Sequence, residues 1–194
     1  MLPETALNAR SRARFTIAAV QPAEVLEFWF GRDRKDWFAK NDAFDAEIRD
    51  RFLALYEAAA AGQLASWQSD ARSCLALVIV LDQFPRNMFR GSARAFAADA
   101  LARAAARVIL QRGWDKSYSD DERTFAYLPF EHSEDLADQE LSMKLFEGNP
   151  NAEWARKHWE IIRRFGRFPH RNAALGRDST PEEAGFLKEH GSSF

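Results

Sequence analysis

The chain has 194 residues, of which 46% are hydrophobic and 13% aromatic, enough apolar side chain for the core of one domain. A formal net charge of -2 and a pI near 6.1 exclude a general electrostatic attraction to nucleic acid or to an anionic membrane. The only cysteine, Cys74, can form neither an intramolecular disulfide nor a zinc cluster, and its apolar neighbours favour an inert buried thiol. We therefore expect a soluble, cytoplasmic protein.

The first residues of the chain do not have the pattern of a folded element. Arg10, Arg12 and Arg14 precede the apolar run 15–20, which is too short and too mixed for the hydrophobic region of a signal peptide. No apolar stretch approaches the roughly 20 residues that span a bilayer. We predict a flexible tail over residues 1–21, followed by one domain over residues 22–194.

The first helices are predicted from their end signals. A short apolar helix over Pro22–Phe30 begins with proline, which suits the first helical position. We expect Asp33–Lys40 to be a loop in which Trp37 and Phe38 fold back onto that helix. A longer helix then begins after the N-cap residue Asn41 and runs to about residue 61.

The most apolar stretch of the chain is Cys74–Leu81, in which eight consecutive residues are apolar. Such a run fits either a buried strand or a central helix, because periodicity alone cannot separate them. Its neighbours are helical and no other segment offers a strand partner, so we predict a buried central helix. Ser69 or Asp70 would cap its beginning, and Pro85 would end it.

The next two helices carry equally clear signals. Ala98–Arg112 is rich in alanine and arginine, with Leu101 among the residues expected to face inward. Ser119 and Glu122 have the spacing of a capping box, and their helix should end just before Pro129.

Three further helices complete the chain. Ser133 is the expected cap of a helix that ends at Gly148, and Asn151 caps the next helix, where Trp154 and His158 belong to the predicted inward stripe. Thr180, followed by proline and two glutamates, begins a last short helix. The prediction is an all-α protein with about eight helices.

Three proline corners punctuate this pattern. Leu81–Gly91 contains Phe-Pro-Arg-Asn, Arg167–Asn172 contains Phe-Pro-His-Arg-Asn, and between them Tyr127–Asp138 has an apolar run followed by proline and polar residues. The prolines recur at intervals of 40 to 44 residues, the length of one helical hairpin. This period predicts a tetratricopeptide-like array of antiparallel helical hairpins.

The same segments resemble a known family. The segments that carry the resemblance are Val25–Gly31, Leu81–Asn87, Leu128–Asp135 and Arg164–Asn172. Over about residues 22–187 the chain is similar to the bacterial family called domain of unknown function 924. The resemblance implies a tetratricopeptide-like fold, and it implies no activity, cofactor or catalytic residue.

Charge is distributed unevenly along the chain. Residues 115–147 have a net charge of -7, whereas residues 86–112 and 156–177 have net charges of +5 and +6. Ion pairs between neighbouring hairpins explain this pattern, because arginine forks fit carboxylates. A charged pocket where the three corners meet explains it as well. The residues expected to line that pocket are Asp82, Arg86, Asn87, Glu131, His132, Glu134, Asp135, His170, Arg171 and Asn172.

Two functions fit such a pocket. The first is a binding module in which Arg86, Arg171 and Asn172 hold a small anion or a peptide terminus. The second is a hydrolase or lyase in which His132 is the general acid or base and Glu131 or Asp135 orients it. No metal-binding motif or glycine-rich phosphate loop is present, and we predict neither a metal nor another cofactor. Oligomeric state is left open.

Overall fold

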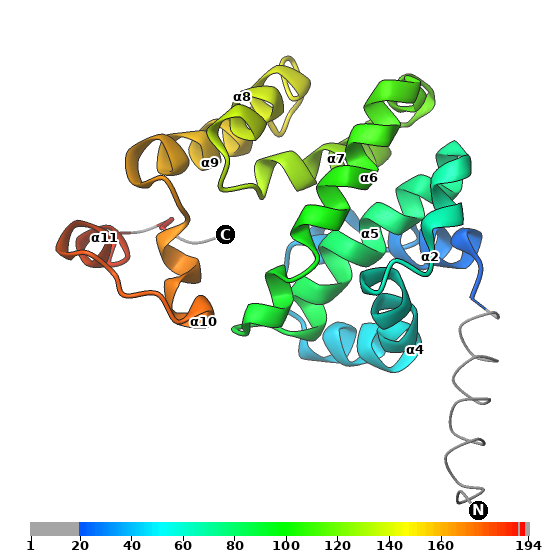
Figure 1. Cartoon of the computed structure of the whole chain (residues 1–194), viewed down its shortest axis with the longest axis horizontal. Coiled ribbons are helices and arrows are strands. Elements are labelled where there is room, and N and C mark those ends of the chain that lie inside the picture. The colour runs from blue at the N-terminus through cyan, green and yellow to red at the C-terminus, as the bar shows by residue number, and fades with distance from the viewer. Residues whose placement is uncertain (1–19, 190, 193–194) are drawn as a thin grey trace, which may run out of the picture.

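The computed structural model describes residues 20–189 and 191–192. All regular secondary structure in this part of the chain is helical, so the prediction of an all-α protein is confirmed (Figure 1). The tail predicted over residues 1–21 lies outside the described residues except for its last two positions. Within the described ranges, every helix is too short or too polar to span a lipid bilayer.

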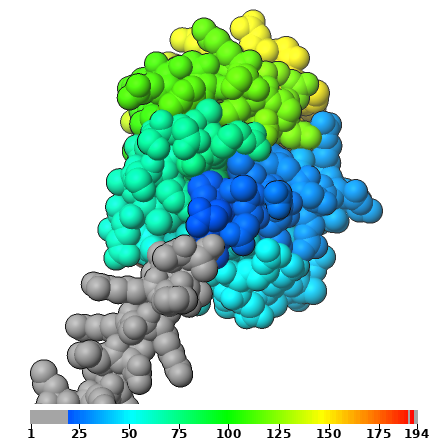
Figure 2. All heavy atoms as spheres, turned by 90° about the vertical axis from the view of Figure 1, so that its right-hand side faces the viewer, coloured from blue at the N-terminus to red at the C-terminus, as the bar shows by residue number. Residues whose placement is uncertain are grey.

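The fold is built around one buried helix, α5 (Ala71–Met88). It packs against α2 (Pro22–Phe30), α4 (Asp42–Ala60), α6 (Asp99–Arg112) and α7 (Asp120–Glu131). Neighbours on several sides account for the apolar run of α5, because no face of this part of the helix is left for water. Figure 2 shows the blue N-terminal region between the green α6–α7 region above it and the cyan residues of α4 below it.

The C-terminal part consists of a helical hairpin and a short irregular segment. Helices α8 (Leu136–Leu145) and α9 (Ala152–Phe165) pack against each other, and α10 (Asn172–Leu175) and α11 (Pro181–Phe186) follow (Figure 1). The remaining short elements are α3 (Arg34–Trp37) and the 3₁₀ turns η1 (Ala65–Ser69), η2 (Ala93–Phe96), η3 (Trp114–Ser117) and η4 (Pro169–Arg171). The tetratricopeptide-like form of the array stays a prediction.

Three of the predicted helix ends are wrong, two of them at a proline, and α8 ends at Leu145 rather than at Gly148. Pro85 and Pro129 lie inside α5 and α7, which continue to Met88 and Glu131. A proline ring holds φ near a helical value, so its main costs are one lost backbone hydrogen bond and crowding with the preceding turn. Both prolines are buried, and the turn after Pro85 carries Arg86 into a polar cluster. Tertiary contacts therefore outweigh the local preference to stop.

Most predicted helix starts are correct. The side chains that accept backbone hydrogen bonds at the expected N-caps are those of Asn41, Asp70, Ser119 and Thr180. Ser133 does not cap α8; Asp135 does, while the Ser133 hydroxyl donates to Asp138. Asn151 makes no side-chain cap, and its amide N–H donates to the Thr124 hydroxyl.

Several side chains face water against expectation. Trp37 is buried and its indole N–H donates to the Trp29 carbonyl, as the folded-back loop predicts, but Phe38 is 65% exposed. Leu101 is 41% and Trp154 49% exposed, although both were expected to face inward. Ala98 and Ala102 of the α6 region and Ala155 of α9 are buried, so Leu101 and Trp154 lie on the outer faces of their helices.

Candidate functional site

The polar cluster begins at the end of α5, where Asp82 and Arg86 share one helix face. The Asp82 side chain is fully buried, and Arg86 Nη1 lies 3.1 Å from its Oδ1 and donates to its carbonyl at 2.6 Å. The Gln83 amide donates to Asp82 Oδ2 at 2.6 Å. Burial alone would raise the pKa of Asp82, but Arg86 and His132 together lower it to about 2. Asp82 is therefore ionised.

His132 faces the same carboxylate from the end of α7. Its Nδ1 lies 3.0 Å from both oxygens of Asp82. Burial lowers the pKa of His132, and Arg86 adds to this, while Asp82 opposes it. The neutral ring directs Nδ1–H at Asp82 and leaves the lone pair on Nε2, which bonds to no described residue. The prediction that Glu131 or Asp135 orients this ring is wrong, because Asp82 does so.

Asp99 joins α5 to the C-terminal segment, a role that the sequence did not reveal. Its two oxygens accept from Arg86 Nη1 and Nη2 at 3.0 and 3.2 Å, and one also accepts from Arg171 Nη1 at 3.3 Å. The Arg171 guanidinium packs on the rings of Phe96 and Phe168, with Cζ 4.5 Å from each centroid. Asp99 and the two rings fix the position of Arg171.

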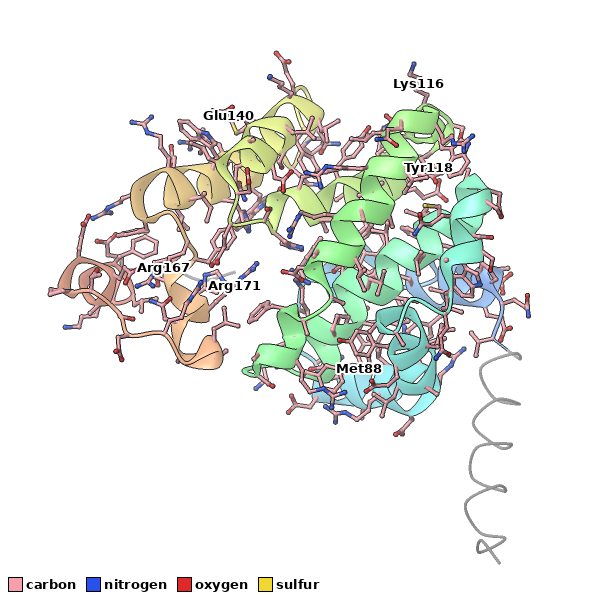
Figure 3. The ribbon with its side chains drawn as sticks, in the orientation of Figure 1. Met88, Lys116, Tyr118, Glu140, Arg167 and Arg171 are labelled. Carbon is pink, nitrogen blue, oxygen red and sulfur yellow. The ribbon has the colours of Figure 1, made fainter. Side chains whose placement is uncertain are left out.

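Arg171 keeps one edge of its guanidinium without a partner. Its Nη1 is taken by Asp99, but Nε is buried and no described residue accepts from Nε or Nη2. Elsewhere in the chain the same Nε–Nη2 edge binds carboxylates, in Arg90 with Asp45 and in Arg167 with Glu183. Figure 3 shows Arg171 reaching from the segment after α9 toward the body of the molecule.

The charge on Arg171 persists in this setting. Burial lowers the pKa of Arg171 to about 10, with a further contribution from Arg86, while Asp99 opposes the shift. The side chain is therefore protonated at neutral pH, and 7% of its surface remains exposed. A buried cation with two free donors on one edge can receive an anion.

A second pair of ionisable groups lies beside the first. Glu131 Oε1 is 3.1 Å from His158 Nδ1, which also contacts the Trp154 carbonyl at 2.9 Å. Burial, and then the charge of Asp82, raise the pKa of Glu131 to about 8. Burial lowers the pKa of His158 to about 3 and that of His170 to about 4. At neutral pH Glu131 is protonated and both rings are neutral.

Three predicted site residues are held elsewhere. Asn87 donates to Asp45 at 2.8 Å, away from the cluster. Glu134 accepts from Arg177 at 2.7 and 2.9 Å and from the backbone N–H of residue 168. The Asn172 amide donates to Ser179 and Glu183 and its oxygen accepts from Arg177. These side chains hold the loops in place, and we remove them from the candidate site.

A surface hollow of about 350 Å³ lies at the end of α5, but its charged groups are already paired. Arg90 binds Asp45, and Arg49 donates to the Met88 carbonyl. In the part of the chain that the structure describes, no group of three or more His, Cys, Asp or Glu side chains is arranged to hold a metal. The candidate site is thus the cluster of Asp82, Arg86, Asp99, His132 and Arg171.

Comparison with other proteins gives relatives without an assigned activity. Residues 25–191 match the model of a family described as bacterial protein of unknown function (DUF924). A solved structure of a protein of unknown function from Agrobacterium tumefaciens is 44% identical, with a TM-score of 0.84. The match covers 87% of this chain and 97% of that one. No curated protein sequence matches the chain.

Proposed function

The chain belongs to the bacterial DUF924 family, and we propose that it binds a small anion, a carboxylate, a phosphate or the terminus of a peptide, at Arg171. The observation that carries the proposal is the unpartnered Nε–Nη2 edge of this buried guanidinium. Arg86 supports the site from α5, because it shares Asp99 with Arg171. His132 faces the same cluster through Asp82, and its Nε2 bonds to no described residue.

The cost of an unpartnered donor supports this proposal. A buried charged donor without a partner costs roughly 1–3 kcal/mol or more, which an accepting ligand would return. Two aromatic rings and Asp99 already fix the guanidinium, so binding need not order a flexible side chain. Phe96 and Asp99 belong to one segment, which lies far from Arg171 in the chain, and Phe168 lies three residues before Arg171, so the position of Arg171 depends on both segments.

Thermal unfolding in different salts tests the binding proposal. Wild-type protein is compared in chloride, small carboxylates and inorganic phosphate at equal ionic strength. We expect at least one anion to raise the midpoint relative to chloride in the wild type and not in Arg171→Gln. The matched control is Arg163→Gln, an exposed arginine of α9 that stacks on Trp159 and should keep the response. Equal responses of the two variants would contradict a specific site.

A second candidate function is proton transfer by His132. Its Nδ1 is fixed by an ionised, fully buried aspartate, and its pKa is lowered, so the neutral ring presents Nε2 as a base. Arg171 would then stabilise negative charge on the substrate. In this form the protein is a small hydrolase or lyase rather than a binding module.

An activity screen separates the two functions. Small carboxylate and phosphate esters, together with hydroxy acids that can eliminate water, are offered to wild type, His132→Gln and Asp82→Asn. A catalytic His132 requires turnover that disappears in His132→Gln and falls in Asp82→Asn, because the asparagine no longer selects the ring tautomer. Anion binding without turnover of any compound would leave the binding module as the function.

A further inference from the structure

We infer that the ligand received by Arg171 is a carboxylate with a single negative charge, and that the site disfavours phosphate dianions. The inference rests on the proposed anion site and specifies its ligand class. It follows from the shape of the free donor edge, from the aromatic rings around it, and from the charge of the surrounding cluster.

The shape of the edge matches two oxygens in one plane. In Arg167 the same edge holds Glu183, with Nε 2.6 Å from Oε1 and Nη2 2.8 Å from Oε2. Arg90 holds Asp45 through the same two nitrogens. The chain thus uses this edge twice for carboxylates, and Arg171 presents it a third time with no partner among the described residues.

Aromatic contacts leave one side of the Arg171 guanidinium for a ligand. The Phe96 and Phe168 ring centroids both lie 4.5 Å from Cζ, and Asp99 takes Nη1. The Nε–Nη2 edge is the part of the guanidinium without a partner among the described residues. A flat carboxylate places both oxygens in the plane of that edge. A tetrahedral phosphate directs its other oxygens out of that plane, where the two nearby rings offer no donors.

The charge of the cluster selects a monoanion. Arg86 and Arg171 are balanced by Asp82 and Asp99, and Glu131 is protonated at neutral pH because burial raises its pKa. A carboxylate therefore leaves one excess negative charge in the buried cluster, and a phosphate dianion leaves two. Each uncompensated buried charge is costly, and like charges at short range repel. The second charge of a dianion therefore adds to this cost, whereas a monoanion has the free donor edge of Arg171 to offset its single charge.

Matched ligand pairs test the inference on the full chain by calorimetric titration at pH 7. The pairs are acetate with inorganic phosphate and benzoate with phenyl phosphate. We expect each carboxylate to bind at least tenfold more tightly than its phosphate partner. Arg171→Lys should weaken carboxylate binding at least tenfold, because lysine keeps the charge but has no planar edge. Arg163→Lys should leave the affinity unchanged.

Nuclear magnetic resonance of wild-type protein removes any dependence on the variant's folding. Benzoate should shift the Arg171 Nε–H resonance, and phenyl phosphate at the same concentration should not. Equal or tighter phosphate binding would overturn the carboxylate inference and leave the anion site standing. Failure of every carboxylate and phosphate to bind or to shift this resonance would overturn both.

Discussion

Replacing Glu131 with glutamine should stabilise the protein at neutral pH, although the substitution removes an ionisable side chain. Glu131 is buried, and its pKa rises from 4.5 to about 8 because of burial and the nearby Asp82 charge. A group whose folded pKa is raised contributes stability below its unfolded pKa, and that stability is lost as pH rises through the folded pKa. The contribution of Glu131 to stability should therefore be lost as pH rises from about 4.5 to 8.

The size of the effect follows from the same shift. At pH 7 the folded chain keeps a proton on Glu131 that the unfolded chain releases. This lowers the free energy of unfolding by about 1.4 kcal/mol for each of the roughly 2.5 pH units between the unfolded pKa of 4.5 and pH 7. Glutamine avoids this cost, of order 3 kcal/mol. In the wild type the carboxyl oxygen Oε2 of Glu131 has no hydrogen-bond partner in the described part of the chain. The glutamine amide nitrogen takes the place of this oxygen, so the variant and the wild type both have one unpartnered polar atom at this position.

Urea denaturation of both proteins at pH 5, 6, 7 and 8 measures the difference. We expect Glu131→Gln to exceed the wild type by an amount that grows with pH and becomes small at pH 5. Glu134→Gln is the control, because the partner Arg177 outweighs burial and lowers the pKa of Glu134. That variant should be less stable than wild type at pH 7, with the deficit shrinking at lower pH. A Glu131 difference independent of pH would refute a protonated side chain.

Three further changes test other features of the fold. Gly166→Ala should cost about 1 kcal/mol in urea unfolding because φ is +67°, whereas Gly185→Ala in helix α11 should be neutral or stabilising. Burial lowers the pKa of His158 to about 3, so its neutral ring contributes stability that is fully present above the unfolded pKa. This contribution to the free energy of unfolding falls by about 2 kcal/mol from pH 7 to pH 5. His158→Gln should remove this pH-dependent contribution. Ser119→Ala should lower thermal stability by about 1 kcal/mol through loss of the capping box, and an unchanged midpoint would contradict its role.

Local signals predicted helix starts better than helix ends. Asn41, Asp70 and Ser119 cap helices as expected, because a side-chain oxygen near free backbone N–H groups is a property of a few adjacent residues. Pro85 and Pro129 misled the prediction of helix ends, since whether a helix continues past proline depends on what the next turn packs against.

The candidate site was predicted only in part. The sequence placed Asp82, Arg86, His132 and Arg171 in one group, and the structure brings these four together. It did not indicate Asp99, which is an isolated acid within an arginine-rich helix. Acidic neighbours in the chain suggested Glu131 or Asp135 as the partner of His132, but a residue 50 positions away fills that role.

The sequence by itself determined the helical class, the position of the buried central helix and most of the helix starts, because these depend on hydrophobic pattern and on residues a few positions apart. Only the tertiary structure decided which carboxylate meets which base. Asp99 bridges Arg86 and Arg171, and Phe96 packs on Arg171, although Asp99 and Arg171 are 72 positions apart in the chain. Such contacts depend on how the helices pack, and no local pattern records them.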